Sequence, residues 1–117
     1  HYQSGLKGFG SDLTKVCAGA QVVVNLVRAE TDCVHSMKTF ELPACGGCVL
    51  TNRTEEQLEF FPEGNAYFST REELMSELDR LLGDAQARKQ LMATARAEAE
   101  PHTYAARARQ LLEIIAA

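Results

Sequence analysis

The chain has 117 residues, of which 45% are hydrophobic and 24% charged, and its formal net charge is −4. This length suits one domain spanning residues 1–117, and the composition argues against extended disorder. Charges of both signs are interleaved, which excludes the basic surface of a nucleic-acid-binding protein, and no apolar stretch approaches the roughly 20 residues that cross a bilayer. The first ten residues lack the layout of a secretory signal. We therefore expect no nucleic-acid partner and no transmembrane segment.

The four cysteines indicate a reducing compartment. They are too few for a disulfide scaffold in a chain of this length. Cys17 and Cys48 have apolar neighbours in the sequence, where a thiol behaves as a small buried hydrophobe. We therefore expect a cytoplasmic protein.

The first half of the chain predicts helices and strands in alternation. A short helix is expected over residues 12–17, with Gly19 ending it. Within residues 20–27, the valines and the leucine at 22–24, 26 and 27 are apolar without alternation, which is typical of a strand buried on both faces in a parallel sheet. A helix is expected over residues 37–45, ended by two glycines, and a short strand over residues 48–51 follows it.

The second half is predicted to be mainly helical, with polar capping residues marking where each helix begins. The elements expected there are, in order, a helical turn over 55–60, a strand over 66–69, and helices that begin after Thr70, Asp84 and Thr103, the first of them ending at Gly83. This alternation predicts the α/β class: a Rossmann-like parallel sheet with flanking helices and a helical C-terminus. Three short strands make a thin sheet, so we expect an incomplete, later portion of a larger doubly wound domain.

The informative segment is residues 35–50, which follow a strand and a loop and open a helix. Open α/β sheets bind ligands at such a place. If Ser36 is the N-cap, the amides of Met37, Lys38 and Thr39 lack partners within the helix. Free amides and the positive end of the helix dipole suit a phosphate, and Lys38 adds a full charge. This helix start is therefore a predicted anion site, which we expect to open into the largest cleft at the carboxyl edge of the sheet.

Glu41 follows Lys38 by three residues and lies on the same side of the predicted helix. A carboxylate one turn beyond a phosphate site can accept hydrogen bonds from vicinal ribose hydroxyls. The pair predicts a nucleoside diphosphate site, although both side chains are also compatible with ordinary solvated positions on a helix. Met37, Phe40 and Ala44 are expected to form the face that packs on the sheet.

The run K-T-F-E-L-P-A-C-G-G-C-V-L, residues 38–50, resembles the pattern R-x-F-E-A-x-A-C-G-x-x-x-L of glycosyltransferases with two Rossmann-like domains, the GT-B fold. It is most similar to the spore-maturation-type or group 1-like glycosyltransferases. Further similar segments occur in the family's order over residues 5–13, 18–28 and 60–82. Their order and spacing extend the resemblance over nearly the whole chain.

The resemblance implies the nucleotide-sugar-binding C-terminal half of a hexosyl-type transferase, with a nucleoside diphosphate sugar as partner and no other cofactor. Glu41 would hold the ribose hydroxyls, and Lys38 with the amides after Ser36 would hold the diphosphate. The backbone around Leu6 and Lys7 would lie near the nucleobase. The acceptor site and the catalytic residues would lie in an N-terminal domain outside this chain, so the chain alone is expected to be inactive.

Three residues depart from the family pattern. Cys33 stands where many related transferases carry a glutamate that contacts the donor sugar, eight residues before Glu41. Lys38 replaces an arginine and loses its bidentate fork. Pro43 removes one backbone hydrogen bond from the helix. These departures leave open the alternative of a non-catalytic α/β nucleotide-binding or interaction module.

Cys45 and Cys48 form a C-x-x-C pair, a spacing found both in redox-active dithiols and in zinc sites. Redox dithiols lie at helix N-termini, whereas this pair follows a helix end. A zinc site built from these cysteines with Cys33 and His35 matches no usual ligand spacing. We expect neither a metal nor a Cys45–Cys48 disulfide, and His35 is either a phosphate contact or an ordinary loop residue.

The remaining candidate residues are expected to be structural. Tyr67 and Phe68 in a short strand favour a place in the core over a base-stacking platform. The basic side chains of the second half are expected on solvated faces: Arg88, Lys89, Arg96, Arg107 and Arg109.

Overall fold

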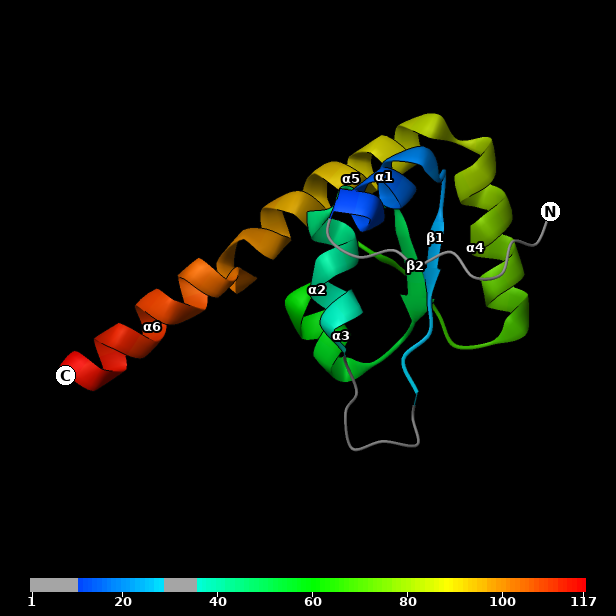
Figure 1. The fold of residues 1–117 in the computed structure, drawn as a ribbon. Helices are drawn as coiled ribbons and strands as arrows, with labels where there is room; N and C mark the ends of the chain where they lie inside the picture. The colour runs from blue at the N-terminus through cyan, green and yellow to red at the C-terminus, as the bar shows by residue number, and fades with distance from the viewer. Residues whose placement is uncertain (1–10, 29–35) are drawn as a thin grey trace.

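A computed structural model describes residues 11–28 and 36–117 of the chain. Helices and strands alternate up to the third strand, after which the chain is helical (Figure 1). The elements are, in order, α1 (Ser11–Gly19), β1 (Val23–Asn25), α2 (Met37–Ala44), β2 (Val49–Asn52), α3 (Glu55–Phe60), β3 (Ala66–Phe68), α4 (Arg71–Gly83), α5 (Ala85–Ala99), the 3-10 turn η1 (Glu100–His102) and α6 (Tyr104–Ala116).

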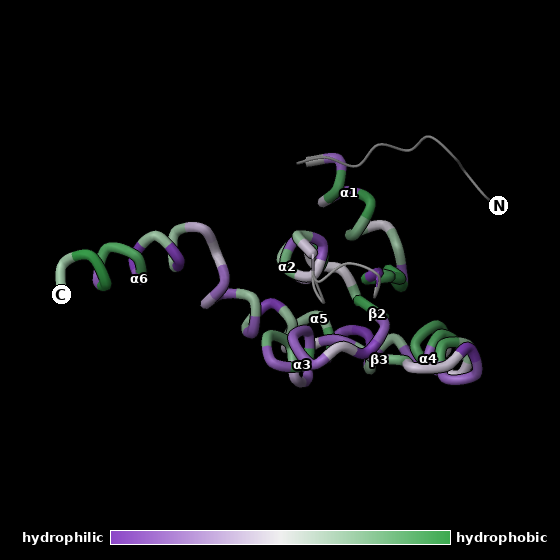
Figure 2. Tube along the Cα trace, turned by 90° about the horizontal axis from the view of Figure 1, so that it is seen from below, coloured by the Kyte–Doolittle hydropathy of each residue, from purple (hydrophilic) through white to green (hydrophobic). Residues whose placement is uncertain are grey.

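The three strands form one parallel sheet in the order β1-β2-β3. Val23 pairs with Val49, and Leu50 pairs with Ala66. Helices α1 and α2 lie on one face of this sheet and α4 and the start of α5 on the other, as Figure 2 shows. The predicted α/β class, a Rossmann-like parallel sheet flanked by helices, is confirmed.

Two apolar clusters hold the layers together, one on each face of the sheet. Under α4 and α5, Leu50 and Phe68 pack with Leu81, and burial of each such side chain contributes roughly 1.5–3 kcal/mol. Under α1 and α2, Val49 packs with Cys17 and Leu42. Val49 and Leu50 point to opposite faces because successive side chains alternate along a strand.

Strand β1 is shorter and more exposed than residues 20–27 predicted. Val24 is 45% exposed and Leu26 69% exposed, so the expectation that this strand is buried on both faces is wrong. Among the described strands β1 lies at the edge of the sheet, and Val24 points away from α2. The apolar residues of this segment therefore report one covered face, that of Val23, and an opposite face that is covered only at Val22, which packs against the cluster under α4 and α5.

Helix α2 packs on the sheet through a different face from the predicted one. Its buried residues are Thr39, Leu42 and Pro43, whereas Met37 is 63% exposed. Met37, Phe40 and Ala44 instead line a cavity facing η1 and α6. The expectation that the apolar side chains face the sheet is wrong, because the hydroxyl of Thr39 has a buried hydrogen-bond partner, Gln57. Thr39 can therefore face the sheet.

The predicted end of α2 at two glycines is confirmed. The amide of Gly46 donates to the carbonyl of Pro43 and that of Gly47 to the carbonyl of Leu42, both at 3.0 Å. This pair of bonds is the Schellman motif, which needs a left-handed residue after the helix. Gly46 supplies it with a φ of +83°.

The predicted caps of the C-terminal helices are confirmed as well. The side chains of Thr70, Asp84 and Thr103 each accept a hydrogen bond from an amide in the first turn of the following helix. Arg88 differs from its prediction, because its guanidinium donates to the carbonyls of Leu81 at 2.6 Å and Leu82 at 3.1 Å. Arg88 therefore supplies hydrogen-bond donors to carbonyls at the C-terminal end of α4 and does not lie on a purely solvated face.

Helix α6 extends away from the sheet, and its last turns are strongly apolar (Figures 1 and 2). Its large apolar side chains are exposed: Tyr104, Leu111, Leu112, Ile114 and Ile115. In the described parts of the chain, no helix combines the length and the hydropathy that a membrane span requires.

Candidate functional site

The candidate site is the first turn of α2, which begins where the parallel strands end (Figure 1). Ser36 is the N-cap, with the extended backbone typical of that position. Met37 and Lys38 occupy the first two helical positions. Their amides have no acceptor within the helix, because the carbonyls four residues earlier lie before it begins. Together with the helix dipole they form the positive start that the sequence predicts.

Thr39 has a different role from the one its position suggests. Its amide donates to the carbonyl of Ser36 at 3.0 Å, so the expectation that this amide is free for a phosphate is wrong. Its hydroxyl oxygen accepts from the amide of Ser36 at 3.2 Å. Thr39 is 2% exposed and therefore braces the helix start from below.

Lys38 and Glu41 lie together on the open side of α2. The Nζ of Lys38 is 3.2 Å from Oε2 of Glu41, and both side chains are partly exposed. An ion pair this exposed contributes about 0–1 kcal/mol, so either partner can exchange it for a ligand at little cost.

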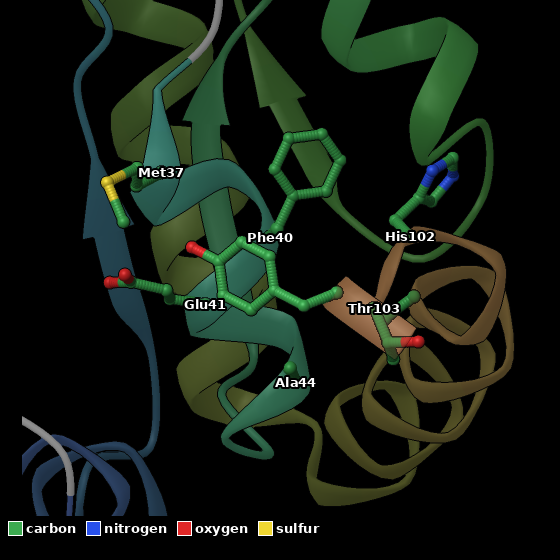
Figure 3. A pocket seen from close by; sticks show the side chains of 8 residues that line it. Met37, Phe40, Glu41, Ala44, His102 and Thr103 are labelled. Atoms are coloured by element: carbon green, nitrogen blue, oxygen red, sulfur yellow. The ribbon is translucent and has the colours of Figure 1, made fainter. Parts of the chain in front are cut away.

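A cavity of about 280 Å³ separates α2 from η1 and the start of α6 (Figure 3). Met37, Phe40, Glu41 and Ala44 line one side, and His102 and Thr103 the other. In Figure 3 the carboxylate of Glu41 points away from His102 and Thr103. Glu41 therefore lines the cavity while its carboxylate is directed away from the η1 side of it.

The first turn of α2 does not open into the largest cavity among the described residues, which corrects the expectation. Ser36 and Met37 line a cavity of about 290 Å³. A larger one, of about 420 Å³, lies between Arg53, Tyr67 and the first turns of α4. Among the described residues, the start of α2 is thus an open helix end rather than a deep pocket.

His102, which the sequence did not single out, joins α2 to the C-terminal helices. Its ring centroid is 5.4 Å from that of Phe40 and 5.1 Å from that of Phe60. Burial, with a smaller contribution from the charge of Arg107, lowers the pKa of His102. The neutral imidazole is therefore the form that packs among the phenyl rings.

Gln57 is a second residue that sequence reasoning missed, and it is fully buried beneath α2. Its Oε1 accepts from the hydroxyls of Thr39 at 3.2 Å and Thr51 at 3.3 Å, and its Nε2 donates to the carbonyl of Asn52 at 2.8 Å. The available signal was the T-x-x-Q spacing from Thr54, which predicts a helix cap. That cap forms, since the amide of Gln57 donates to Oγ1 of Thr54, but nothing local indicates where the side-chain amide goes.

The described cysteines Cys17, Cys45 and Cys48 carry free thiols. Burial raises the pKa of Cys17 and of Cys48, so both are protonated near neutral pH. Within residues 11–28 and 36–117, no group of three or more metal-ligating side chains comes together. Cys33 and His35, which complete the zinc site considered above, lie outside the described residues.

Phe68 belongs to the core, as predicted, whereas Tyr67 is only partly buried and lies outside both apolar clusters. Phe68 is buried, and the hydroxyl of Tyr67 lies 2.9 Å from the carbonyl of Gln57 and 2.6 Å from that of Phe61. Leu6 and Lys7, the residues expected near a nucleobase, lie outside the described residues.

A parallel sheet flanked by helices, with one helix that begins at its carboxyl edge and carries a lysine and a glutamate in its first turns, defines a Rossmann-like domain. Residues 4–113 match the family described as glycosyl transferase-like, and the chain belongs to this family. The match confirms the resemblance to group 1-like glycosyltransferases and supports glycosyl transfer as the general class of activity. No curated protein and no solved structure matches the chain significantly.

Proposed function

We propose that this chain forms the donor site of a glycosyltransferase of the GT-B fold, where it binds the nucleoside diphosphate of a nucleotide-sugar. The observation that carries this proposal is the placement of Lys38 and Glu41 in the first turns of α2. Nζ of Lys38 lies 3.2 Å from Oε2 of Glu41, and both side chains are partly open to solvent. The acceptor and any catalytic base belong to an N-terminal domain outside this chain. The chain by itself therefore binds the donor without turning it over.

The diphosphate lies against the amides of Met37 and Lys38 and against the ammonium group of Lys38. When the bond between sugar and diphosphate breaks, negative charge grows on the departing phosphate. Amides and a cation already aimed at that charge stabilise it without reorganising, which lowers the barrier to transfer. No other cofactor enters this scheme.

The carboxylate of Glu41 binds the ribose by accepting hydrogen bonds from the 2′ and 3′ hydroxyl groups of the sugar. A carboxylate accepts both hydrogen bonds, and a bond to a charged acceptor contributes roughly 1.5–3 kcal/mol, against about 1 kcal/mol for a neutral one. On binding, the diphosphate replaces Glu41 as the partner of Lys38, while the ribose hydroxyls replace Lys38 as partners of Glu41. The ion pair thus holds both groups ready for their ligands.

Substitution of Glu41 tests the proposal by calorimetric titration with ADP, GDP and UDP. Glu41→Gln keeps the shape of the side chain but loses the charge, and the affinity for the tightest-binding nucleotide should fall about tenfold. Glu41→Ala should lower it further. The exposed helix residue Glu113 offers a matched control, and Glu113→Ala should leave the affinity unchanged.

The 2′,3′-dideoxy form of the same nucleotide separates the ribose contact from a change in charge. Because loss of Glu41 frees Lys38 for the diphosphate, both substitutions should leave dideoxynucleotide binding equal or slightly stronger. Equal binding of the ribonucleotide by the wild type and by Glu41→Ala would contradict the assignment of Glu41.

A further inference from the structure

Beneath the helix start, the side-chain amide of Gln57 makes hydrogen bonds with both of its ends. The oxygen accepts two hydroxyl hydrogens, from Thr39 on α2 and from Thr51 on β2. The nitrogen donates to the backbone carbonyl of Asn52. Turning the amide over would place its oxygen against that carbonyl, so its orientation is determined by the acceptor on β2.

The orientation of Gln57 in turn determines how Thr39 bonds. The hydroxyl hydrogen of Thr39 is used by Gln57, which leaves the lone pairs of that oxygen to accept from the amide of Ser36 at 3.2 Å. A relay of hydrogen bonds therefore runs from Asn52 on the sheet through Gln57 and Thr39 to the N-cap of α2. The two side chains that carry it, those of Gln57 and Thr39, are both buried.

Gln57 is itself held firmly at the backbone. Its amide donates to Oγ1 of Thr54 at 3.2 Å, and its carbonyl accepts from the amide of Phe61 at 2.8 Å and lies 2.9 Å from the hydroxyl of Tyr67 on β3. The side chain that supports α2 is thus anchored to two strands of the sheet. A buried network with every member satisfied is rigid, because each unpaired group would cost its full desolvation.

We propose that Gln57 is a positioning residue for the diphosphate site: it holds Ser36 and Thr39 so that the amides between them, those of Met37 and Lys38, face the ligand. The inference rests on the proposed donor site at the start of α2. Binding by oriented amides depends on their placement to within a fraction of an ångström. The hydrogen bonds of Gln57 beneath α2 therefore affect the affinity for the diphosphate as well as the stability of the fold.

Two threonine substitutions test this role, because both remove a hydroxyl bond to the same oxygen of Gln57. Thr39→Val breaks the relay on the side of α2, whereas Thr51→Val breaks a bond of similar length on the side of β2. In the folded full chain, calorimetry with the tightest-binding of ADP, GDP and UDP should show an affinity about tenfold lower for Thr39→Val. The affinity of Thr51→Val should be within about twofold of that of the wild type. Thr39→Ser keeps the hydroxyl and should therefore bind as the wild type does.

Gln57→Met removes the amide at similar side-chain length and should lower the affinity as Thr39→Val does. The double variant of Gln57→Met with Thr39→Val should be no weaker than either single variant, because both break one relay. Amide hydrogen exchange gives a readout independent of ligand. The amide of Ser36 should exchange at least about tenfold faster in Thr39→Val and Gln57→Met than in Thr51→Val.

The outcomes separate the two proposals. If the wild type binds a nucleoside diphosphate and folded Thr39→Val binds it equally well, the positioning role is overturned and the donor site stands. An equal loss of affinity in Thr39→Val and Thr51→Val would also overturn it, since that pattern indicates general destabilisation. If the wild type binds none of ADP, GDP and UDP, the donor site itself fails, and the positioning role fails with it.

Discussion

At the scale of single residues, Tyr67 shows how a half-buried hydroxyl stabilises the irregular segment between α3 and β3. The oxygen of Tyr67 lies within hydrogen-bond distance of two carbonyls at the C-terminal end of α3: that of the C-cap Phe61, and that of Gln57, which also accepts from the amide of Phe61. The one hydroxyl hydrogen of Tyr67 serves one carbonyl at a time. Burial, as the largest cause, raises the pKa of Tyr67 to about 12.

This raised pKa predicts a late step in an alkaline titration of the tyrosinate absorbance. The chain has three tyrosines, and Tyr67 should ionise only near pH 12, well above the ordinary value of about 10. Because the neutral phenol is favoured in the folded state, its contribution to stability is complete below about pH 10 and is lost as the pH rises through about 12. Tyr67→Phe should remove the late step, and three tyrosines titrating together near pH 10 would contradict the prediction.

At the scale of elements, the loop before β3 is tied to α5 by a carboxylate and by close backbone contact. Glu98 accepts hydrogen bonds from the amides of Glu63 at 3.0 Å and Gly64 at 2.9 Å. A Cβ added to Gly64 would lie 2.5 Å from the Cα of Ala95. Glycine is thus required here by space, and the contact sets how closely α5 approaches the sheet.

Gly64→Ala should therefore lower the free energy of unfolding by about 3 kcal/mol, since backbone rather than a flexible side chain must move. Gly83→Ala is the matched control, because nothing lies within 4 Å of its added Cβ. That substitution should change stability by less than about 1 kcal/mol. Urea unfolding of both variants checks the prediction, and equal stabilities would show that α5 can shift to make room.

At the scale of the whole molecule, stability resides in the layered part, and α6 adds little to it. No residue of α6 is buried, and its large apolar side chains near the C-terminus are exposed. The two buried clusters lie instead on the faces of the sheet. The aromatic contacts of His102 join η1 to α2 before α6 begins.

Removal of residues 108–117 should accordingly change the free energy of unfolding by less than about 1 kcal/mol. Leu50→Ala, at a fully buried position of the central strand, should cost about 2–5 kcal/mol in the same chain. Thermal unfolding followed by circular dichroism measures both. A truncation as costly as the core substitution would mean that α6 packs on the fold in solution.

The sequence alone was sufficient for features decided by neighbours in the chain. The caps at Thr70, Asp84 and Thr103 and the glycine stop at Gly46 were predicted, because each depends on bonds between residues a few positions apart. The α/β class followed from the alternation of elements. The family followed from the order of motifs along the chain, which the match over residues 4–113 confirms.

Tertiary structure decided which side of each element is buried and which polar groups meet. The sequence could not show that Thr39 rather than Met37 faces the sheet, because the choice depends on Gln57, eighteen residues further along. Likewise, the partner of Arg88 is the end of another helix. Such contacts depend on how distant segments pack, and packing is a property of the assembled layers, which local spacing does not encode.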